Sequence, residues 1–130
     1  MTAERTKDRP RWMAQNSQAF FAPHLGNNVS TGLMDWMVRQ CLDCSATAAV
    51  EAVKIAFRTD LRTEAAAIEA PTLILHGDAD ASAPVALCGR RLAKTVPDSL
   101  YKEYSLAGHG ICVTHAEAVN RDLLDFIGGA

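Results

Sequence analysis

The chain has 130 residues, a formal net charge of −2 at pH 7 and 48% hydrophobic residues. This length allows one domain with a modest core, and lysine and arginine are spread along the chain without the basic patch of a nucleic-acid-binding protein. The charged start, residues 1–11, lacks the apolar segment of a secretory signal, and no apolar run approaches membrane-spanning length. We therefore expect a cytoplasmic protein with neither nucleic acid nor membrane as a partner.

The first part of the chain is predicted to form three helices. Pro10 can occupy the first turn of a helix that runs to about Phe21 and is stopped by Pro23. Ser30 and Ser45 are plausible N-caps of the second and third helices, because a serine hydroxyl can accept a hydrogen bond from a backbone amide of the first turn. Apolar residues recur at helical spacing after both serines, as they do in amphipathic helices.

The four cysteines are interpreted as structural thiols, since a buried cysteine behaves as a small hydrophobic residue. Cys41 and Cys44 form a C-x-x-C pair, whereas Cys88 and Cys112 are isolated, so no second pair completes a zinc site. A metal-binding domain built on Cys41 and Cys44 is a weaker alternative. We expect no bound metal.

Strands and helices are predicted to alternate in the second part of the chain. A short apolar run, Thr72–Leu75, is bounded by proline and glycine, which is typical of a buried parallel strand. The elements expected after it are, in order, a helix starting at Pro84, a second strand over Leu100–Tyr104, and a last helix that begins with a capping box at Thr114–Glu117. The predicted fold class is α/β, with a helical segment over residues 1–58 and a strand-helix-strand-helix part over residues 59–130.

Polar residues follow both predicted strands. His76-Gly77-Asp78-Ala79-Asp80 comes after the first strand, and Ala107-Gly108-His109-Gly110 after the second. Ligands of open α/β sheets bind at the carboxyl ends of parallel strands, so an acid and a base placed there are expected to meet. Asp78 and Asp80 compete for the acid: Asp78 suits a hydrogen bond within the turn, whereas Asp80 lies further out, where a carboxylate could reach an imidazole. His76, at the strand end, is interpreted as a hydrogen-bonded structural ring.

These two stretches resemble the carboxyl-terminal part of an α/β-hydrolase, most closely the aryl esterase and cofactor-free haloperoxidase (perhydrolase) branch. The resemblance is strong from about Thr59 to Ile127 and weaker, though colinear, from about Trp12 to Phe57. Such enzymes use a serine, an acid and a histidine in that chain order. The resemblance implies that Asp80 is the acid and His109 the base, and it implies no metal or organic cofactor.

By the same resemblance, residues 1–58 correspond to a helical cap over an active site. Met34, Trp36 and Met37 are then candidates to line an acyl or aryl pocket. The alternative is that these residues only hold the helices together. For Met34 and Met37 we favour that alternative, because methionines at helical spacing usually belong to a core.

The nucleophile of the family is missing from the sequence. None of the six serines lies in the G-x-S-x-G motif that places a nucleophile on a strand-to-helix turn, and the nearest approach, Asn28–Gly32, lacks the first glycine. We therefore predict half of a serine esterase, inactive alone, whose substrate would be a small ester or acid. Its remainder would come from another polypeptide, unless the chain self-associates or is a truncated product. The alternative function is a non-catalytic module that binds a partner through an uncovered sheet edge.

Overall fold

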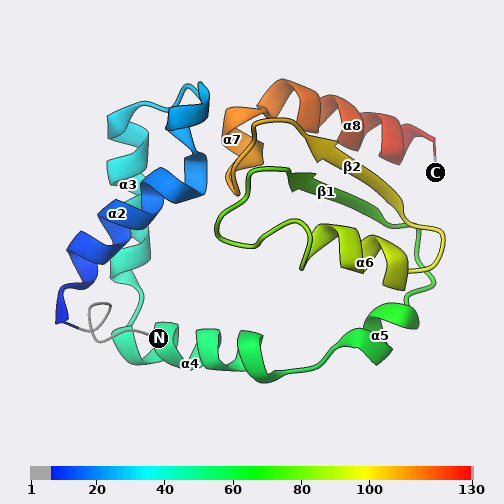
Figure 1. Ribbon diagram of the computed structural model, residues 1–130, viewed down its shortest axis with the longest axis horizontal. Coiled ribbons are helices and arrows are strands. Elements are labelled where there is room, and N and C mark those ends of the chain that lie inside the picture. The colour runs from blue at the N-terminus through cyan, green and yellow to red at the C-terminus, as the bar shows by residue number, and fades with distance from the viewer. Residues whose placement is uncertain (1–6, 130) are drawn as a thin grey trace. The chain divides into compact units, whose positions relative to one another are not determined.

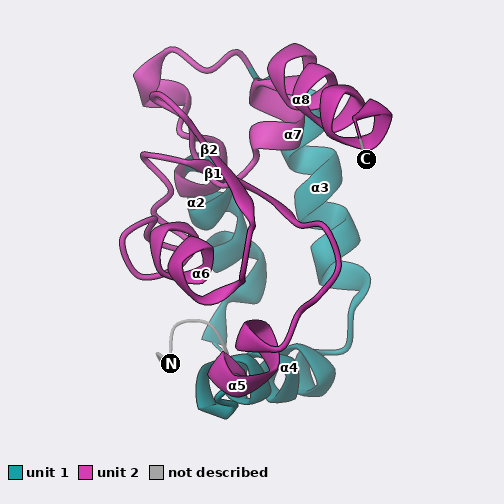
Figure 2. Cartoon of the chain, turned by 90° about the vertical axis from the view of Figure 1, so that its right-hand side faces the viewer, with its two compact units in different colours: residues 1–18, 29–60 teal, residues 19–28, 61–130 magenta. Residues whose placement is uncertain are grey.

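A computed structural model describes residues 7–129, which fall into two compact units (Figure 2). Unit 1 holds the described residues up to Gln18 together with Val29–Asp60, and unit 2 holds Ala19–Asn28 together with the chain from Leu61 onward. The predicted division of the chain after residue 58 stays a prediction, and it was drawn without Ala19–Asn28, which belongs to unit 2. The assignment of residues 1–58 to a cap stays a prediction.

Three helices in the first part of the chain confirm the expectation from its sequence: α2 (Arg9–Phe21), α3 (Thr31–Asp43) and α4 (Ala46–Arg58), shown in Figure 1. The hydroxyl of Ser30 accepts a hydrogen bond from the Leu33 amide at 3.2 Å, and that of Ser45 accepts one from the Ala48 amide at 3.4 Å. Both serines therefore act as the N-caps predicted from their positions.

Unit 2 is built on two parallel strands, β1 (Leu73–Gly77) and β2 (Leu100–Tyr104), which confirm the predicted fold class. Their register pairs Leu73 with Leu100 and Gly77 with Tyr104. The other elements of the unit are η1 (Pro23–Leu25), α5 (Arg62–Ala66), α6 (Gly89–Thr95), α7 (Ile111–Thr114) and α8 (Ala116–Gly128). Figure 1 shows α6 and α8 flanking the strands on opposite sides.

The core of unit 2 lies at the carboxyl end of β2. Tyr104, Ala107 and Val119 are buried there in contact with one another, and the half-buried Leu75 and Ile111 pack against them. This cluster joins β2, α8 and the loop that follows β2. The loop containing His109 is therefore attached to this buried cluster through Ala107.

Two predicted helix starts are wrong. The helix expected from Pro84 begins only at Gly89, because Cys88 has φ −115° and ψ −92°, outside the helical region. Thr114 does not cap the last helix either: it ends α7, and its hydroxyl donates to the carbonyl of Gly110 at 3.2 Å. His115 occupies the N-cap position of α8 without a side-chain capping bond.

The cysteines also differ from expectation. All four are free thiols, and Cys41, Cys44 and Cys112 are exposed, so only Cys88 is partly buried. The Arg9 guanidinium donates to the backbone carbonyls of Cys41 and Cys44, both at 2.7 Å, which satisfies groups left open at the end of α3. Between residues 7 and 129, no three potential metal-binding side chains of His, Cys, Asp or Glu come together. No helix in that range is long and apolar enough to cross a membrane.

Candidate active site

Asp80 and His109 meet at the carboxyl ends of the two strands. The His109 Nδ1 atom lies 2.6 Å from the Asp80 Oδ2 atom, a distance typical of a strong charge-assisted hydrogen bond. The Asp80 side chain is only 3% exposed, whereas the His109 side chain is 42% exposed. Because an ionised carboxylate can only accept, Nδ1 carries the proton and the outer Nε2 atom of a neutral ring is left as an acceptor.

The carboxylate of Asp80 is held by its own turn. Its Oδ1 atom accepts hydrogen bonds from the backbone amides of Ser82 and Ala83, both at 2.8 Å. These two bonds replace the water that a buried carboxylate loses, and they leave Oδ2 to face the imidazole. The His76 Nε2 atom lies 3.3 Å from the same Oδ2 and 2.8 Å from the carbonyl oxygen of Ala83.

The loops after the two strands are bonded to each other. The amide of Asp78 donates to the carbonyl of Tyr104, and the amide of Ala79 donates to that of Ala107, both at 3.0 Å. Gly77 is needed at this point, because a Cβ atom there would lie 2.3 Å from the Ala107 carbonyl oxygen and 2.4 Å from that of Gly108. The close approach brings the chain segments that carry Asp80 and His109 together.

The segment Ala19–Asn28 supports the His109 loop from another direction within unit 2. The amide of Gly110 donates to the carbonyl of Phe20 at 3.0 Å, and the Phe20 ring meets the His109 ring edge-on with centroids 4.8 Å apart. Asn27 donates from Nδ2 to the carbonyls of Ala22 and Leu106, at 3.0 and 2.9 Å. Sequence reasoning missed this support, since no local pattern links the two segments.

Asp78, the rival for the acid, points elsewhere. Its side chain is exposed and accepts a hydrogen bond from the Ser105 hydroxyl at 3.3 Å. Among residues 7–129, none of the hydrogen bonds found joins a serine hydroxyl to His109. Geometry therefore favours Asp80 as the partner of the imidazole, and no serine of the described chain is placed as its nucleophile.

Comparison with known proteins finds similarity to haloperoxidases and to an AB hydrolase superfamily protein. The chain is 37% identical over 102 residues to a non-heme haloperoxidase from Rhodococcus erythropolis, which covers 78% of this chain and 37% of that protein. It is 33% identical over 120 residues to an AB hydrolase superfamily protein from Bacillus subtilis, covering 92% of this chain and 42% of that one. A crystal structure of a bromoperoxidase from Bacillus anthracis matches with a TM-score of 0.89 and 26% identity, over 97% of this chain and 46% of that one.

The chain has the fold of the carboxyl-terminal part of α/β-hydrolases, and its relatives include non-heme haloperoxidases and an AB hydrolase superfamily protein. It spans less than half the length of the relatives it matches. No family model matches it.

The residues proposed for a substrate pocket all lie in α3 of unit 1. Met34 is 7% exposed and its sulfur accepts a hydrogen bond from the Gln18 side chain at 3.7 Å, as a core methionine would. Trp36 is 52% exposed, and Met37 is partly buried. Their role in binding an acyl or aryl group stays a prediction.

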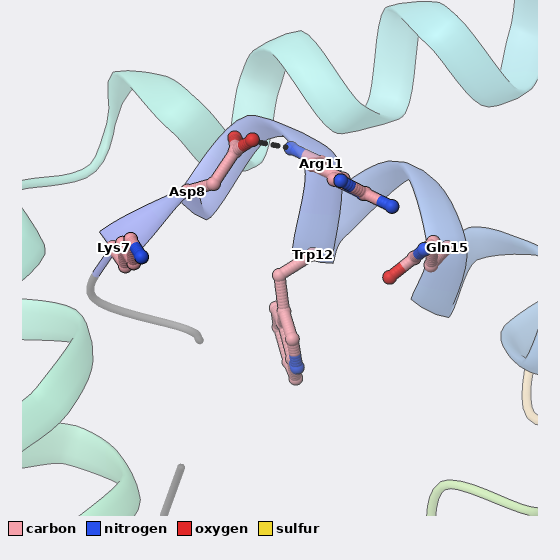
Figure 3. Close-up of a pocket in the computed structure, with 5 residues that line it drawn as sticks. All are labelled: Lys7, Asp8, Arg11, Trp12 and Gln15. Carbon is pink, nitrogen blue, oxygen red and sulfur yellow. Dashed lines mark hydrogen bonds between the residues drawn. The ribbon is translucent and has the colours of Figure 1, made fainter. Parts of the chain in front are cut away.

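Unit 1 also has a surface hollow, drawn in Figure 3. It is lined at the start of α2 by Lys7, Asp8, Arg11, Trp12 and Gln15. The Asp8 carboxylate accepts from the Arg11 amide at 3.1 Å, the dashed line in Figure 3, while the Trp12 indole points away from that bond. Among the described residues that line it there is no serine, cysteine or histidine, so they offer no nucleophile of the kind expected for the candidate site.

Two polar clusters on the strands shift the pKa values of their members. The Arg90 guanidinium donates two hydrogen bonds to the Glu103 carboxylate, both at 2.8 Å, and they lower the pKa of Glu103. Burial, together with a hydrogen bond from its hydroxyl to Asp122 at 2.7 Å, raises the pKa of Tyr104 to about 12. The hydrogen bond from Lys102 lowers the pKa of Asp122. Both clusters tie β2 to a neighbouring helix, so they belong to the scaffold of the candidate site.

Proposed function

We propose that the chain supplies the acid, Asp80, and the base, His109, of a serine hydrolase that acts on carboxylic esters. The observation that carries this proposal is the 2.6 Å contact between a buried carboxylate and Nδ1 of a half-exposed imidazole. In such a site the free Nε2 atom takes the proton of a serine hydroxyl as its oxygen attacks the ester carbonyl. Asp80 fixes the tautomer of His109 and stabilises the imidazolium that forms.

The nucleophile of the proposed site would come from a second polypeptide segment. Ser30 and Ser45 cap helices, the Ser105 hydroxyl binds Asp78, and none of the six serines lies in a G-x-S-x-G motif. The oxyanion hole that stabilises the tetrahedral intermediate is built beside the nucleophile, so it would come with that segment. The resemblance to haloperoxidases extends the proposal to perhydrolysis, in which hydrogen peroxide replaces water in attacking the acyl-enzyme and releases a peracid.

The test is complementation. The purified chain alone should show negligible hydrolysis of an aryl acetate, because a site without its nucleophile keeps only weak residual catalysis. Activity should appear when the chain is mixed or co-expressed with the nucleophile-bearing half of a related hydrolase. In that mixture His109→Ala or Asp80→Asn should lower kcat by roughly a thousandfold or more.

Asp78→Asn is the matched control, because it changes a carboxylate two residues away that does not touch His109. It should leave the activity of the mixture within about twofold of the unaltered chain, as expected for an exposed polar change outside the site. Robust hydrolysis by the chain alone, lost on His109→Ala, would overturn the proposal and indicate a nucleophile within it. Equal losses from Asp78→Asn and Asp80→Asn would overturn the assignment of the acid.

A second candidate function is a module that binds a partner protein, and the uncovered edge of β1 supports it. The Leu100 amide donates to the carbonyl of Thr72, just before β1, and the amide of Asp78, just after β1, donates to the Tyr104 carbonyl. Even-numbered residues along β1 therefore direct their backbone groups toward β2. Since parallel ladders alternate, Leu73 and Leu75 direct their backbone groups to the other edge of β1, where the described chain has no strand. Such an edge can pair with a strand of a second polypeptide or a second copy.

Sedimentation of the chain over a range of concentrations tests the module. Self-association through the edge predicts a dimer that weakens in Leu73→Pro, since proline removes only the outward-facing amide at that position. A monomer at all concentrations that also fails to bind the complementary half would exclude this function.

A further inference from the structure

Asp80 has a second imidazole beside it. The Nε2 atom of His76 lies 2.8 Å from the Ala83 carbonyl oxygen and 3.3 Å from Oδ2 of Asp80. A carbonyl oxygen can only accept, so Nε2 of His76 must carry a proton. The single N–H group therefore donates to Ala83 and also approaches the carboxylate oxygen that faces His109.

The His76 ring has little freedom to leave this position. Its side chain is 12% exposed, and it comes from the fourth residue of β1. Gly89, the first residue of α6, packs against it, since a Cβ atom there would lie 2.7 Å from Nδ1 and 2.9 Å from Cγ of the ring. A glycine is thus required at the start of α6 if the ring is to lie between this helix and the turn at Asp80.

The hydrogen bonds of the Asp80 turn connect Asp80, Ala83 and His76 to one another. Two amides, from Ser82 and Ala83, bind Oδ1 of Asp80, and the carbonyl of Ala83 is bound in turn by His76. His76 thereby joins the turn to β1, the rigid element from which the turn departs. The amides of Asp78 and Ala79 tie the start of the turn to Tyr104 and Ala107, whereas the bond from His76 ties its far end, at Ala83, to β1.

We propose that His76 is a positioning residue for the Asp80–His109 pair. Its Nε2–H group fixes the turn so that Oδ2 of Asp80 faces Nδ1 of His109, which keeps His109 in the tautomer whose Nε2 atom accepts a proton. The catalytic meaning of this role rests on the proposed function. Its geometric effect is independent of any nucleophile.

The test reads the tautomer of His109 by NMR in the full chain labelled with 15N-histidine. His76→Gln keeps an N–H donor at the place of Nε2, and His76→Phe keeps a ring of similar shape without the donor. In the phenylalanine variant the ratio of the Nδ1–H to the Nε2–H tautomer of His109 should fall about fivefold, the effect of one net hydrogen bond. The glutamine variant should restore most of the ratio, and His24→Gln, which removes an exposed histidine, should not change it.

Several outcomes would overturn the inference. One is an unchanged His109 tautomer ratio in a folded His76→Phe variant, and another is an equal loss in the phenylalanine and glutamine variants. If the phenylalanine variant does not fold, the unaltered chain decides: His76 itself must be in its Nε2–H tautomer, and a spectrum showing Nδ1–H would refute the proposed bond. A complementation experiment without ester hydrolysis, in a chain that shows the expected tautomers, would refute the proposed function and leave this inference standing.

Discussion

Replacing Gly77 by alanine should destabilise unit 2 by forcing two loops apart. The added Cβ atom would lie 2.3 Å from the Ala107 carbonyl oxygen, and side-chain Cβ atoms essentially never come closer than 3.0 Å to such atoms. The loop must therefore move by about 0.7 Å, although Ala107 is fully buried. Overpacking of this kind costs about 1–3 kcal/mol, and the Ala79–Ala107 hydrogen bond, worth ~1 kcal/mol, would lengthen as well.

Alanine also lowers the conformational entropy of the unfolded chain, which stabilises the folded state by roughly 0.4–1 kcal/mol. We therefore expect the free energy of unfolding to fall by a net amount of about 2–3 kcal/mol. Urea unfolding followed by circular dichroism should show a midpoint lower by about 1–2 M. Gly128→Ala is the control, because a Cβ atom at that helical position meets nothing within 4 Å. Its midpoint should stay the same or rise slightly. A Gly77→Ala midpoint equal to that of the unaltered chain would refute the steric argument.

Three further changes test other parts of unit 2. Val119→Ala should lower the free energy of unfolding by about 1–3 kcal/mol, because Val119 is 6% exposed in the core. In the same urea assay, Leu124→Ala at a 70% exposed position of the same helix should change that free energy by less than about 0.5 kcal/mol. The raised pKa of Tyr104, about 12, means that its contribution to stability is complete below pH 10 and is lost as the pH rises through about 12. Tyr104→Phe should remove this alkaline loss in unfolding curves measured against pH. Asn27→Ala removes two hydrogen bonds and should raise amide exchange in the His109 loop, while Asn28→Ala at an exposed neighbour should not.

The sequence predicts the strands and the meeting of Asp80 with His109 for a simple geometric reason. A parallel pair brings the ends of its strands to one edge, and the register places Gly77 beside Tyr104. Asp80 comes three residues after the first strand and His109 five residues after the second. Residues that follow parallel strands so closely have little room to separate. The apolar runs and polar loops were therefore sufficient to predict that an acid and a base meet at this edge, whereas the choice of Asp80 over Asp78 also used the family resemblance.

The support from Ala19–Asn28 could not be predicted in this way. The bond from Asn27 to Leu106 joins residues 79 positions apart, and helix periodicity in α2 does not show that its last residues belong with unit 2. The capping box at Thr114 failed for a related reason. Its local pattern is correct, but a preceding helical turn already uses the threonine hydroxyl, so a neighbouring element decides the outcome.

The arrangement around Asp80 is more than a buried carboxylate needs for stability. Two backbone amides satisfy Oδ1, and the nearly buried His76 lies within 3.3 Å of Oδ2, so the carboxylate would have donors without His109. The His109 ring, in contrast, is 42% exposed and contributes little burial. In the proposed function, an exposed imidazole fixed by a buried acid transfers protons through the Nε2 atom of its neutral ring. The geometry of the pair therefore fits the proposed proton transfer at His109 better than a role in the folding of unit 2 alone.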